Sequence, residues 1–300
     1  MNGLYEQLCR ELRGRVLRDE PMSRHTTWRV GGPTDLFIEP ADGEDLAVAL
    51  RLLTTARCPW LTIGAGSNLL VRDGGIRGAV LHPTRLRRLE IGNGGGVRVG
   101  AGLPLMTLIR ATVARGLAGL EGLAGIPGTV GGGVVMNAGA GGQQLADVVE
   151  SAILLGPQGP EVWSRERLDF AYRASAVSAG QVVGEATLRL RPEDPRRLAE
   201  AFSGRMAARA AAQRVGGPNA GSVFKNPPGV SAWRLIDEAG LRGAVEGGAQ
   251  VAERHSNFIV NRHGACAGDI LRLIDRIREE VRRQSGVALE TEIRIVGEDR

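Results

Sequence analysis

The 300-residue sequence is poor in aromatic side chains and in cysteine. Only 4% of residues are aromatic, so any hydrophobic core must be built mainly from Leu, Val, Ile and Ala, within a hydrophobic fraction of 43%. The three cysteines, Cys9, Cys58 and Cys266, are odd in number and lack metal-ligand spacing. This pattern favours reduced thiols in a cytoplasmic protein and predicts no bound metal.

Long apolar runs and concentrated charge are also missing. Residues 1–24 are too charged for a signal peptide, and no run is long enough to cross a bilayer, so we expect no membrane partner. The net charge of +5 comes from scattered arginines without stacking aromatics, which argues against a nucleic-acid partner. An acidic small-molecule substrate and a simply arginine-rich surface are both compatible with that charge.

Lysine is nearly absent, because Lys225 is the single lysine among 38 lysine and arginine residues. Chance survival at an exposed site is one explanation. The other is that a compact ammonium is required where the planar guanidinium of arginine would not fit. The second hypothesis predicts that Lys225→Arg loses activity.

Glycine, by contrast, is abundant, with 44 residues. Residues 125–140 read GIPGTVGGGVVMNAGA, and a second glycine-rich run, GAGSNLL at 64–70, follows a predicted strand. Glycine removes the Cβ that keeps a ligand away from the main chain, and successive N–H groups can form an anion-binding concavity. A surface loop is the alternative for either run alone, whereas two such loops favour one site for a long, phosphate-bearing ligand.

The run at 64–70 is not a Rossmann fingerprint. Leu69 stands where G-x-G-x-x-G has its third glycine, and Asp73-Gly74-Gly75 would soon stop any helix. A nicotinamide-binding Rossmann domain is therefore not expected.

The hydrophobic pattern predicts an α+β chain without internal repeats. Helices are expected over residues 3–13, from an N-cap at Asp42 through Leu53, and over 105–114, 195 to about 214, 233–239 and 270–281. Strands are expected over 36–38, 61–63, 76–81, 97–99, 152–155, 182–190, 258–260 and 289–296, with Glu290, Glu292 and Arg294 on one polar face of the last.

Six motifs, taken in order, resemble the UDP-N-acetylenolpyruvoylglucosamine reductase family. They are HTTWRVGG (25–32), TIGAGSNLLV (62–71), the run at 125–140, FAYRAS (170–175), AGSVFKNPPG (220–229) and LETEIRIVG (289–297). The likeness covers about residues 25–297 and is similar to the form of the family that lacks an extra substrate-covering loop.

The resemblance implies a two-part FAD-binding module of the vanillyl-alcohol-oxidase type, followed by a C-terminal α+β substrate-binding domain. We expect the boundaries at 1–82, 83–196 and 197–300, with the last strand able to return to the first part. It also implies non-covalent FAD, NADPH as co-substrate and a monomer. The implied cofactor-binding residues are Gly64, Ala65, Gly66, Ser67 and Asn68 in the first loop, and Gly128, Thr129, Gly132, Asn137 and Ala138 in the second.

The implied reaction is the reduction of UDP-N-acetylglucosamine-enolpyruvate to UDP-N-acetylmuramate, a precursor of bacterial cell wall. NADPH reduces the flavin, which then passes hydride to the enolpyruvyl ether. The resemblance implies that Arg173 stabilises the developing charge, that Glu292 is an acid near the carboxylate and that Ser222 donates the proton. Tyr172, Lys225 and Asn226 are expected to bind substrate; a role for Lys225 in stabilising the Ser222 alkoxide is our own inference.

Each role has a plainer alternative. Ser222 could satisfy a turn, Arg173 could belong to a surface ion pair, and Glu292 could be a solvated strand residue. His255 and His263 lack ligand spacing and are expected to be structural.

Two departures from the family pattern stand out. Gly141-Gly142 replaces a frequent tyrosine, and Gln213-Arg214 replaces a common glutamine–proline pair. The first puts part of the flavin or substrate packing in doubt, and the second puts a phosphate contact in doubt. The competing functions are another FAD oxidoreductase of the same superfamily and a non-catalytic flavin-binding regulator.

Overall fold

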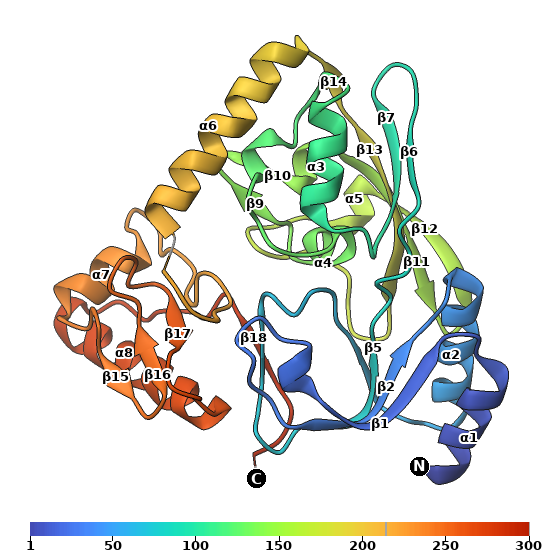
Figure 1. Ribbon diagram of the computed structural model, residues 1–300, viewed down its shortest axis with the longest axis horizontal. Helices are drawn as coiled ribbons and strands as arrows, with labels where there is room; N and C mark the ends of the chain where they lie inside the picture. The colour runs from blue at the N-terminus through green and yellow to red at the C-terminus, as the bar shows by residue number, and fades with distance from the viewer. Residues whose placement is uncertain (214, 300) are drawn as a thin grey trace. The chain divides into compact units, whose positions relative to one another are not determined.

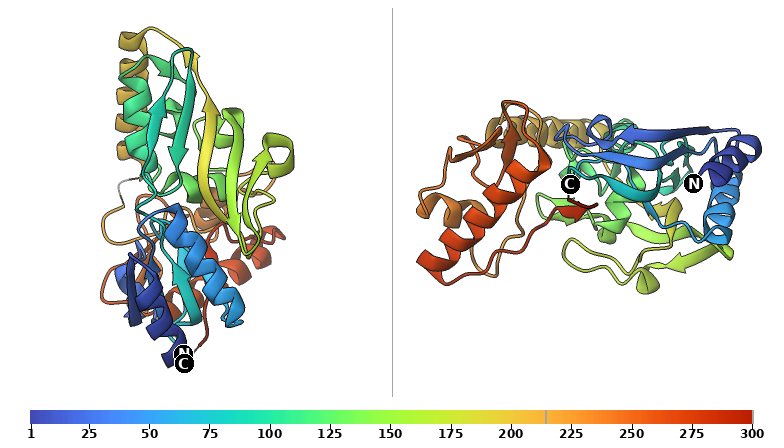
Figure 2. Two further views of the ribbon diagram at one scale, coloured as in Figure 1. Left: turned by 90° about the vertical axis from the view of Figure 1, so that its right-hand side faces the viewer. Right: turned by 90° about the horizontal axis from the view of Figure 1, so that it is seen from below.

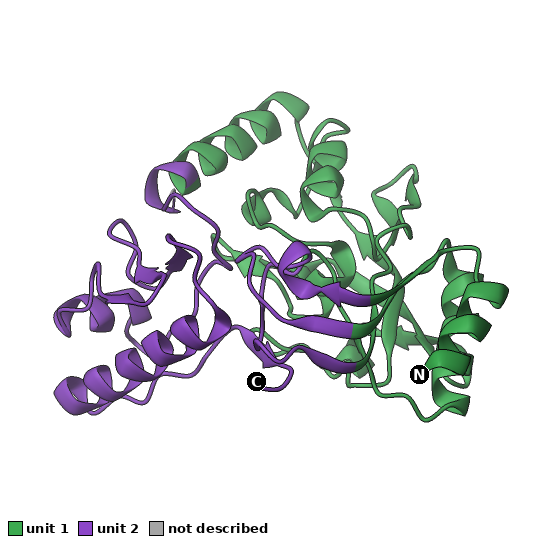
Figure 3. Cartoon of the chain, turned by 60° about the horizontal axis from the view of Figure 1, so that its bottom comes forward, with its two compact units in different colours: residues 1–18, 35–65, 78–209 green, residues 19–34, 66–77, 210–300 purple. Residues whose placement is uncertain are grey.

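The computed structural model describes residues 1–213 and 215–299, which form two compact units (Figure 3). Unit 1 comprises residues 1–18, 35–65 and 78–209, and unit 2 comprises 19–34, 66–77 and 210–300. The division into three segments expected from the sequence remains a prediction beside this grouping.

The elements are labelled in Figure 1. The helices are α1 (Asn2–Glu11), α2 (Gly43–Thr55), α3 (Leu105–Val113), α4 (Val130–Val135), α5 (Arg165–Leu168), α6 (Pro195–Gln213), α7 (Ala232–Glu238) and α8 (Ala267–Ser285), with 3-10 turns at Met22–Arg24, Glu121–Leu123 and Leu145–Asp147. The strands are β1 (Arg15–Pro21), β2 (Pro33–Glu39), β3 (Trp60–Thr62), β4 (Leu69–Val71), β5 (Ile76–Leu81), β6 (Leu89–Ile91), β7 (Gly96–Gly100), β8 (Leu117–Ala118), β9 (Gly139–Ala140), β10 (Gln143–Gln144), β11 (Val149–Gly156), β12 (Gly159–Ser164), β13 (Val182–Arg189), β14 (Arg191–Pro192), β15 (Val245–Glu246), β16 (Ala249–Val251), β17 (Ile259–Asn261) and β18 (Arg294–Val296).

The main sheet of unit 1 has five antiparallel strands in the order β12-β11-β13-β7-β6, and its long central strands are clear in Figure 2. Val99, Leu154 and Leu188 are buried on this sheet, in a core built almost wholly of aliphatic side chains. The scarcity of aromatic residues in the sequence predicts such a core.

The helix predicted to begin at Asp42 is confirmed as α2. The Asp42 carboxylate accepts a hydrogen bond from the Asp45 N–H, which satisfies a donor of the first turn. The predicted apolar face is buried as well, including Leu46, Leu50 and Leu53. This helix belongs to a second core cluster that also contains Leu8 of α1.

In unit 2 the predicted amphipathic helix is confirmed as α8, which buries Ile270, Leu273, Ile274, Ile277 and Val281. Asp73 holds its start, because the carboxylate accepts hydrogen bonds from the Ala267 and Gly268 N–H groups, each at 2.9 Å. The helix packs against the antiparallel sheet β15-β16-β17 and against α7. Trp28, fully buried in the same core, donates its indole N–H to the Ile259 carbonyl at 2.7 Å.

Three expectations were wrong in extent or kind. The closing strand predicted over 289–296 is limited to β18, since residues 290–292 hydrogen-bond instead to residues 223–225 and the chain bends at 292–293. The strand predicted over 61–63 spans residues 60–62 as β3, and it is half-exposed at the edge of the sheet β1-β2-β5-β3. The glycine run is not all loop, because it contains α4.

Among the described residues, no helix combines the length and the apolar character that crossing a membrane requires.

Candidate functional site

The two glycine-rich runs meet in unit 1. A methyl group placed on Gly64 would lie 2.4 Å from Thr129 Oγ1, so a side chain at 64 would collide with the second run. Thr129 is buried and is the N-cap of α4, where its hydroxyl accepts from the Gly132 N–H at 3.4 Å. The two runs therefore lie in close contact at this point, and a shared ligand remains a prediction.

The glycines of α4 have different neighbours. Methyl groups on Gly131 and Gly133 would lie 2.8 Å from Ala101 Cβ and 2.7 Å from a Leu145 methyl, so these two glycines allow close internal packing. Gly132 is exposed, and among the described residues a methyl there would approach only Thr129 Oγ1, at an ordinary 3.5 Å. Internal packing does not account for Gly132. A side-chain-free, exposed helix face fits a cofactor that lies against the backbone.

Asn137 is buried and connects the glycine run to the following segments. Its Nδ2 donates to Gln144 Oε1 and to the Ala171 carbonyl, and its Oδ1 accepts from the Ala146 N–H, each at 3.0 Å. Both N–H donors of the Asn137 amide are therefore used within unit 1. The neighbouring Ala138 is half-buried against the unit 1 core.

Arg173 lies in the short loop that Asn137 holds. Its φ of +59° is in the left-handed region, which is sparsely populated by bulky side chains and is enriched at functional sites. The guanidinium carbon lies 5.2 Å from the centroid of the Tyr172 ring, which is 51% exposed. A methyl on Gly139 would lie 3.0 Å from Arg173 Nη1, so the arginine rests against the end of the glycine run.

The rest of the first glycine loop belongs to unit 2, apart from the exposed Ala65. Gly66 has a φ of +61°, and a methyl on it would lie 2.0 Å from the His25 carbonyl oxygen, so only glycine fits there. The Asn68 side chain donates to the Glu292 carbonyl at 3.0 Å, and the Asn68 carbonyl accepts from the Arg294 N–H at 3.0 Å. This loop thus holds the segment that carries a predicted catalytic residue.

Ser222 and Glu292 lie on adjoining segments of unit 2. The Glu292 N–H donates to the Val223 carbonyl at 2.7 Å, and the Lys225 N–H donates to the Glu290 carbonyl at 2.9 Å. Ser222 itself is half-buried. The structure therefore places the segment that carries Ser222 and Lys225 beside the segment that carries Glu292, although the two segments are far apart in the sequence.

The two predicted substrate-binding residues after Ser222 have different surroundings. Lys225 Nζ lies 3.3 Å from Glu290 Oε2 in a largely exposed pair, which contributes little to stability. The exposed Asn226 uses its Oδ1 to accept from the Ala232 N–H at 3.0 Å, at the start of α7, and its Nδ2 is its remaining polar group. Of the departure at 213–214, Gln213 ends α6, and Arg214 lies outside the described residues.

Arg205 of α6 fills the space beside Gly141, where the family often has a tyrosine. A methyl on Gly141 would lie 2.3 Å from Arg205 Nη1, which donates to the Gly141 carbonyl at 3.1 Å. The contact joins residues 64 apart in the sequence, so no local pattern indicates it.

Glu121 lies in the same network, which the sequence did not indicate. Its carboxylate accepts from the Gly119 N–H and from Gln143 Nε2, each at 2.7 Å. Burial alone would raise the pKa of Glu121, but these hydrogen bonds and the charge of Arg205 outweigh it and lower the pKa below its usual value. Glu121 therefore stays ionised and fixes the turn before the glycine run.

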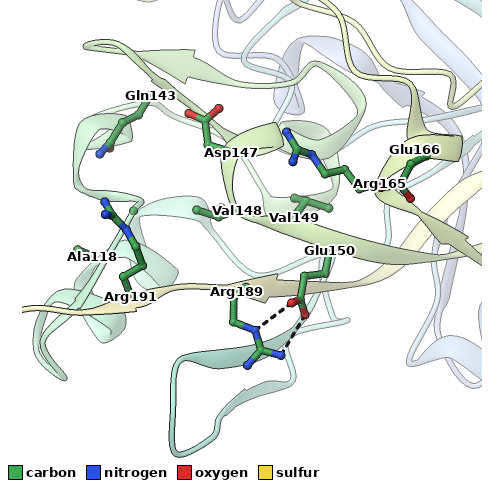
Figure 4. Close-up of a pocket in the computed structure, with 11 residues that line it drawn as sticks. Ala118, Gln143, Asp147, Val148, Val149, Glu150, Arg165, Glu166, Arg189 and Arg191 are labelled. Atoms are coloured by element: carbon green, nitrogen blue, oxygen red, sulfur yellow. Dashed lines mark hydrogen bonds and ion pairs between the residues drawn. The ribbon is translucent and has the colours of Figure 1, made fainter.

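An open pocket of about 670 Å³ lies elsewhere in unit 1, beside β11, β13 and α5 (Figure 4). Its walls carry Asp147, Glu150, Glu166 and three arginines, and Arg189 pairs with Glu150 at 2.9 Å. Its charges balance, and its described lining includes none of the residues predicted for catalysis or cofactor binding. Among the described residues, no cluster of three or more His, Cys, Asp or Glu side chains could hold a metal ion.

Comparisons with known proteins agree with the motif order. A family model described as "UDP-N-acetylenolpyruvoylglucosamine reductase, C-terminal domain" matches residues 212–296, and one described as "FAD binding domain" matches 34–164. The reductase of that name from Syntrophotalea carbinolica is 52% identical over 99% of this chain and 100% of its own, and that from Geobacter sulfurreducens is 51% identical over 99% of each.

The crystal structure of UDP-N-acetylenolpyruvylglucosamine reductase from Thermus caldophilus covers 95% of this chain and 99% of its own, with a TM-score of 0.81 and 34% identity. The glucose dehydrogenase Phl p 4.0202 shares the fold alone, with a TM-score of 0.52 and 17% identity over 64% of this chain and 44% of its own. The α+β fold expected from the resemblance, an FAD-binding module followed by a C-terminal domain of this family, is thus confirmed. The chain belongs to the UDP-N-acetylenolpyruvoylglucosamine reductase family of FAD-dependent oxidoreductases.

Proposed function

We propose that the chain reduces the enolpyruvyl ether of UDP-N-acetylglucosamine-enolpyruvate to UDP-N-acetylmuramate, with NADPH as the electron donor and Ser222 as the proton donor. The observation that carries this proposal is the backbone pairing of residues 223–225 with 290–292, which brings Ser222, Lys225 and Glu292 onto adjoining segments. Bound FAD supplies the hydride chemistry.

The side chains have to control charge and one proton. Hydride addition to the terminal carbon of the enolpyruvyl group places negative charge on the neighbouring carbon and its carboxylate. Arg173 stabilises that charge, and Glu292, as an acid near the carboxylate, does the same by hydrogen bonding, both more strongly in the transition state than in the ground state. The left-handed backbone of Arg173 and the hydrogen bond from the Glu292 N–H to the Val223 carbonyl support a fixed position for each residue.

Ser222 then protonates the carbanionic carbon. A serine hydroxyl is a weak acid, so its alkoxide needs a stabilising neighbour. We assign this role to Lys225, the only lysine in the sequence, which lies three residues after Ser222 and pairs with Glu290 at 3.3 Å. A compact ammonium can approach an alkoxide from any direction, whereas a guanidinium requires a planar fork, which supports the expectation that Lys225→Arg is impaired.

The two half-reactions test the proposal separately. NADPH should bleach the flavin absorbance of both the natural protein and Ser222→Ala, and the enolpyruvyl sugar nucleotide should restore it anaerobically in the natural protein alone. General acid catalysis contributes about 10²–10⁴-fold, which sets the expected loss. The matched control is Ser178→Ala, an exposed serine in unit 1.

Equal losses in both half-reactions would assign Ser222 to folding or flavin binding instead. A natural protein that binds FAD but is not reoxidised by the sugar nucleotide would favour a non-catalytic flavin-binding role.

A further inference from the structure

Arg209, on the last part of α6, packs onto the beginning of the glycine run. A methyl placed on Gly125 would lie 2.7 Å from Arg209 Cδ and 3.5 Å from Met206 Sδ. Gly125 therefore makes room for the arginine stem. The guanidinium is held against the same run that Arg173 contacts at Gly139.

Within the part of the chain that the structure describes, Arg209 has no compensating anion. Among residues 1–213 and 215–299, no hydrogen-bond acceptor or acidic side chain pairs with its guanidinium. Arg205, one helical turn earlier, shows the contrast, because it donates to the Gly141 carbonyl and is attracted to Glu121. Burial lowers the pKa of Arg209, and the positive charge of Arg173 lowers it further.

Two neighbouring cations in a partly dehydrated environment repel each other, and the repulsion is relieved when an anion binds between them. In a structural role, an arginine at this position would be expected to have a carboxylate or carbonyl partner, as Arg205 has. The guanidinium also presents two parallel N–H donors, which match the oxygens of a carboxylate or phosphate.

We propose that Arg209 is a second anion-binding residue beside Arg173, and that its guanidinium receives an oxyanion of the enolpyruvyl sugar nucleotide. This inference rests on the proposed function for the identity of the ligand. A carboxylate and a diphosphate are both available on that substrate, and the experiment below separates them.

The test measures binding to the oxidised, FAD-loaded enzyme by flavin absorbance changes, using UDP-N-acetylglucosamine-enolpyruvate and UDP as separate probes. A charge-assisted hydrogen bond is worth about 1.5–3 kcal/mol, so Arg209→Met should raise the substrate Kd about 10- to 150-fold. Arg209→Lys retains the positive charge without the planar guanidinium, so its Kd should lie between those of the natural protein and Arg209→Met. Arg197→Met, on the exposed first turn of the same helix, is the matched control.

An equal rise in the Kd of UDP would place the diphosphate at Arg209, and a rise for the substrate alone would place the carboxylate there. Kd values within twofold of the natural protein for both probes would overturn the proposal. The proposal would also fail if Arg209→Met lost FAD and thermal stability while Arg209→Lys restored both, together with full substrate affinity. That pattern needs only a cation in a structural position. Failure of the natural protein to bind the sugar nucleotide would instead contradict the proposed function.

Discussion

Gly132→Ala tests whether a cofactor lies against α4. Gly132 is exposed within a helix, and among the described residues a methyl there would approach only Thr129 Oγ1, at 3.5 Å. Alanine is favoured over glycine in a helix by about 0.5–1 kcal/mol. Without FAD the variant should therefore be slightly more stable than the natural protein, with a Tm raised by about 1–3 °C.

With FAD the sign should reverse. If the cofactor lies against the backbone of Gly132, the new methyl intrudes on it, and overpacking of this kind costs about 1–3 kcal/mol. The Kd for FAD should rise about 5- to 150-fold, since each 1.4 kcal/mol is a factor of ten. The stabilisation that FAD gives at a fixed concentration should fall accordingly.

The assay compares thermal melts of the apoprotein with FAD titrations followed by quenching of flavin fluorescence. Gly131→Ala is the control, because its methyl would lie 2.8 Å from Ala101 Cβ and 3.3 Å from the Ala101 carbonyl oxygen. That variant should be destabilised with or without FAD. An unchanged FAD affinity in Gly132→Ala would refute the argument that the glycine makes room for the cofactor.

Three further predictions concern side chains outside the proposed chemistry. Glu121→Gln should lower the free energy of unfolding in urea by about 1–3 kcal/mol at pH 7, because one of the two groups that donate to Glu121 then meets an amide NH₂. Since the folded-state pKa of Glu121 is lowered, the difference between the two proteins should shrink as the pH falls below about 4.5. A difference that does not depend on pH would contradict this prediction. Burial lowers the pKa of His255 despite the attraction of Asp237, so the protein should become less stable as the pH falls through about 6.5. In His255→Gln the Tm should depend less on pH between about 7.5 and 5.5, and an unchanged slope of Tm against pH would exclude His255 as the cause. Asn137→Asp should cost about 2–4 kcal/mol, because a carboxylate cannot donate to the Ala171 carbonyl, and a melt within 1 °C of the natural protein would count against that hydrogen bond.

Elements with strong periodicity could be predicted from the sequence, and α8 illustrates why. Its buried residues recur every three or four positions, so the pattern already contains the information that packing uses. The end of the chain shows the limit. Residues 289–296 alternate as a strand would, but the hydrogen bonds of 290–292 go to residues 223–225, a pairing that depends on tertiary structure.

The glycine run shows a different limit. Its composition correctly indicated close backbone approaches, but three consecutive glycines have the lowest helix propensity apart from proline, so α4 was not expected. The helix forms because Thr129 caps it and because Gly131 and Gly133 pack tightly on Ala101 and Leu145. These contacts bring distant segments together and leave no local signal.

The residues that hold the proposed site in place were the least predictable, and they share a chemical type. Asn137 donates to the carbonyl of Ala171, two residues before Arg173. The buried Asn257 exchanges two hydrogen bonds with the Phe224 main chain, two residues after Ser222.

Asn68 completes the set, because it donates to the carbonyl of Glu292 itself. An asparagine side chain carries both a donor and an acceptor, so each can replace a missing strand partner for a backbone that follows no regular ladder. Arg173, Ser222 and Glu292, the residues proposed for catalysis, thus each lie in an irregular segment that is fixed by an asparagine amide. A fixed position is what electrostatic stabilisation of a transition state requires, because donors that must reorient during the reaction lose most of their effect.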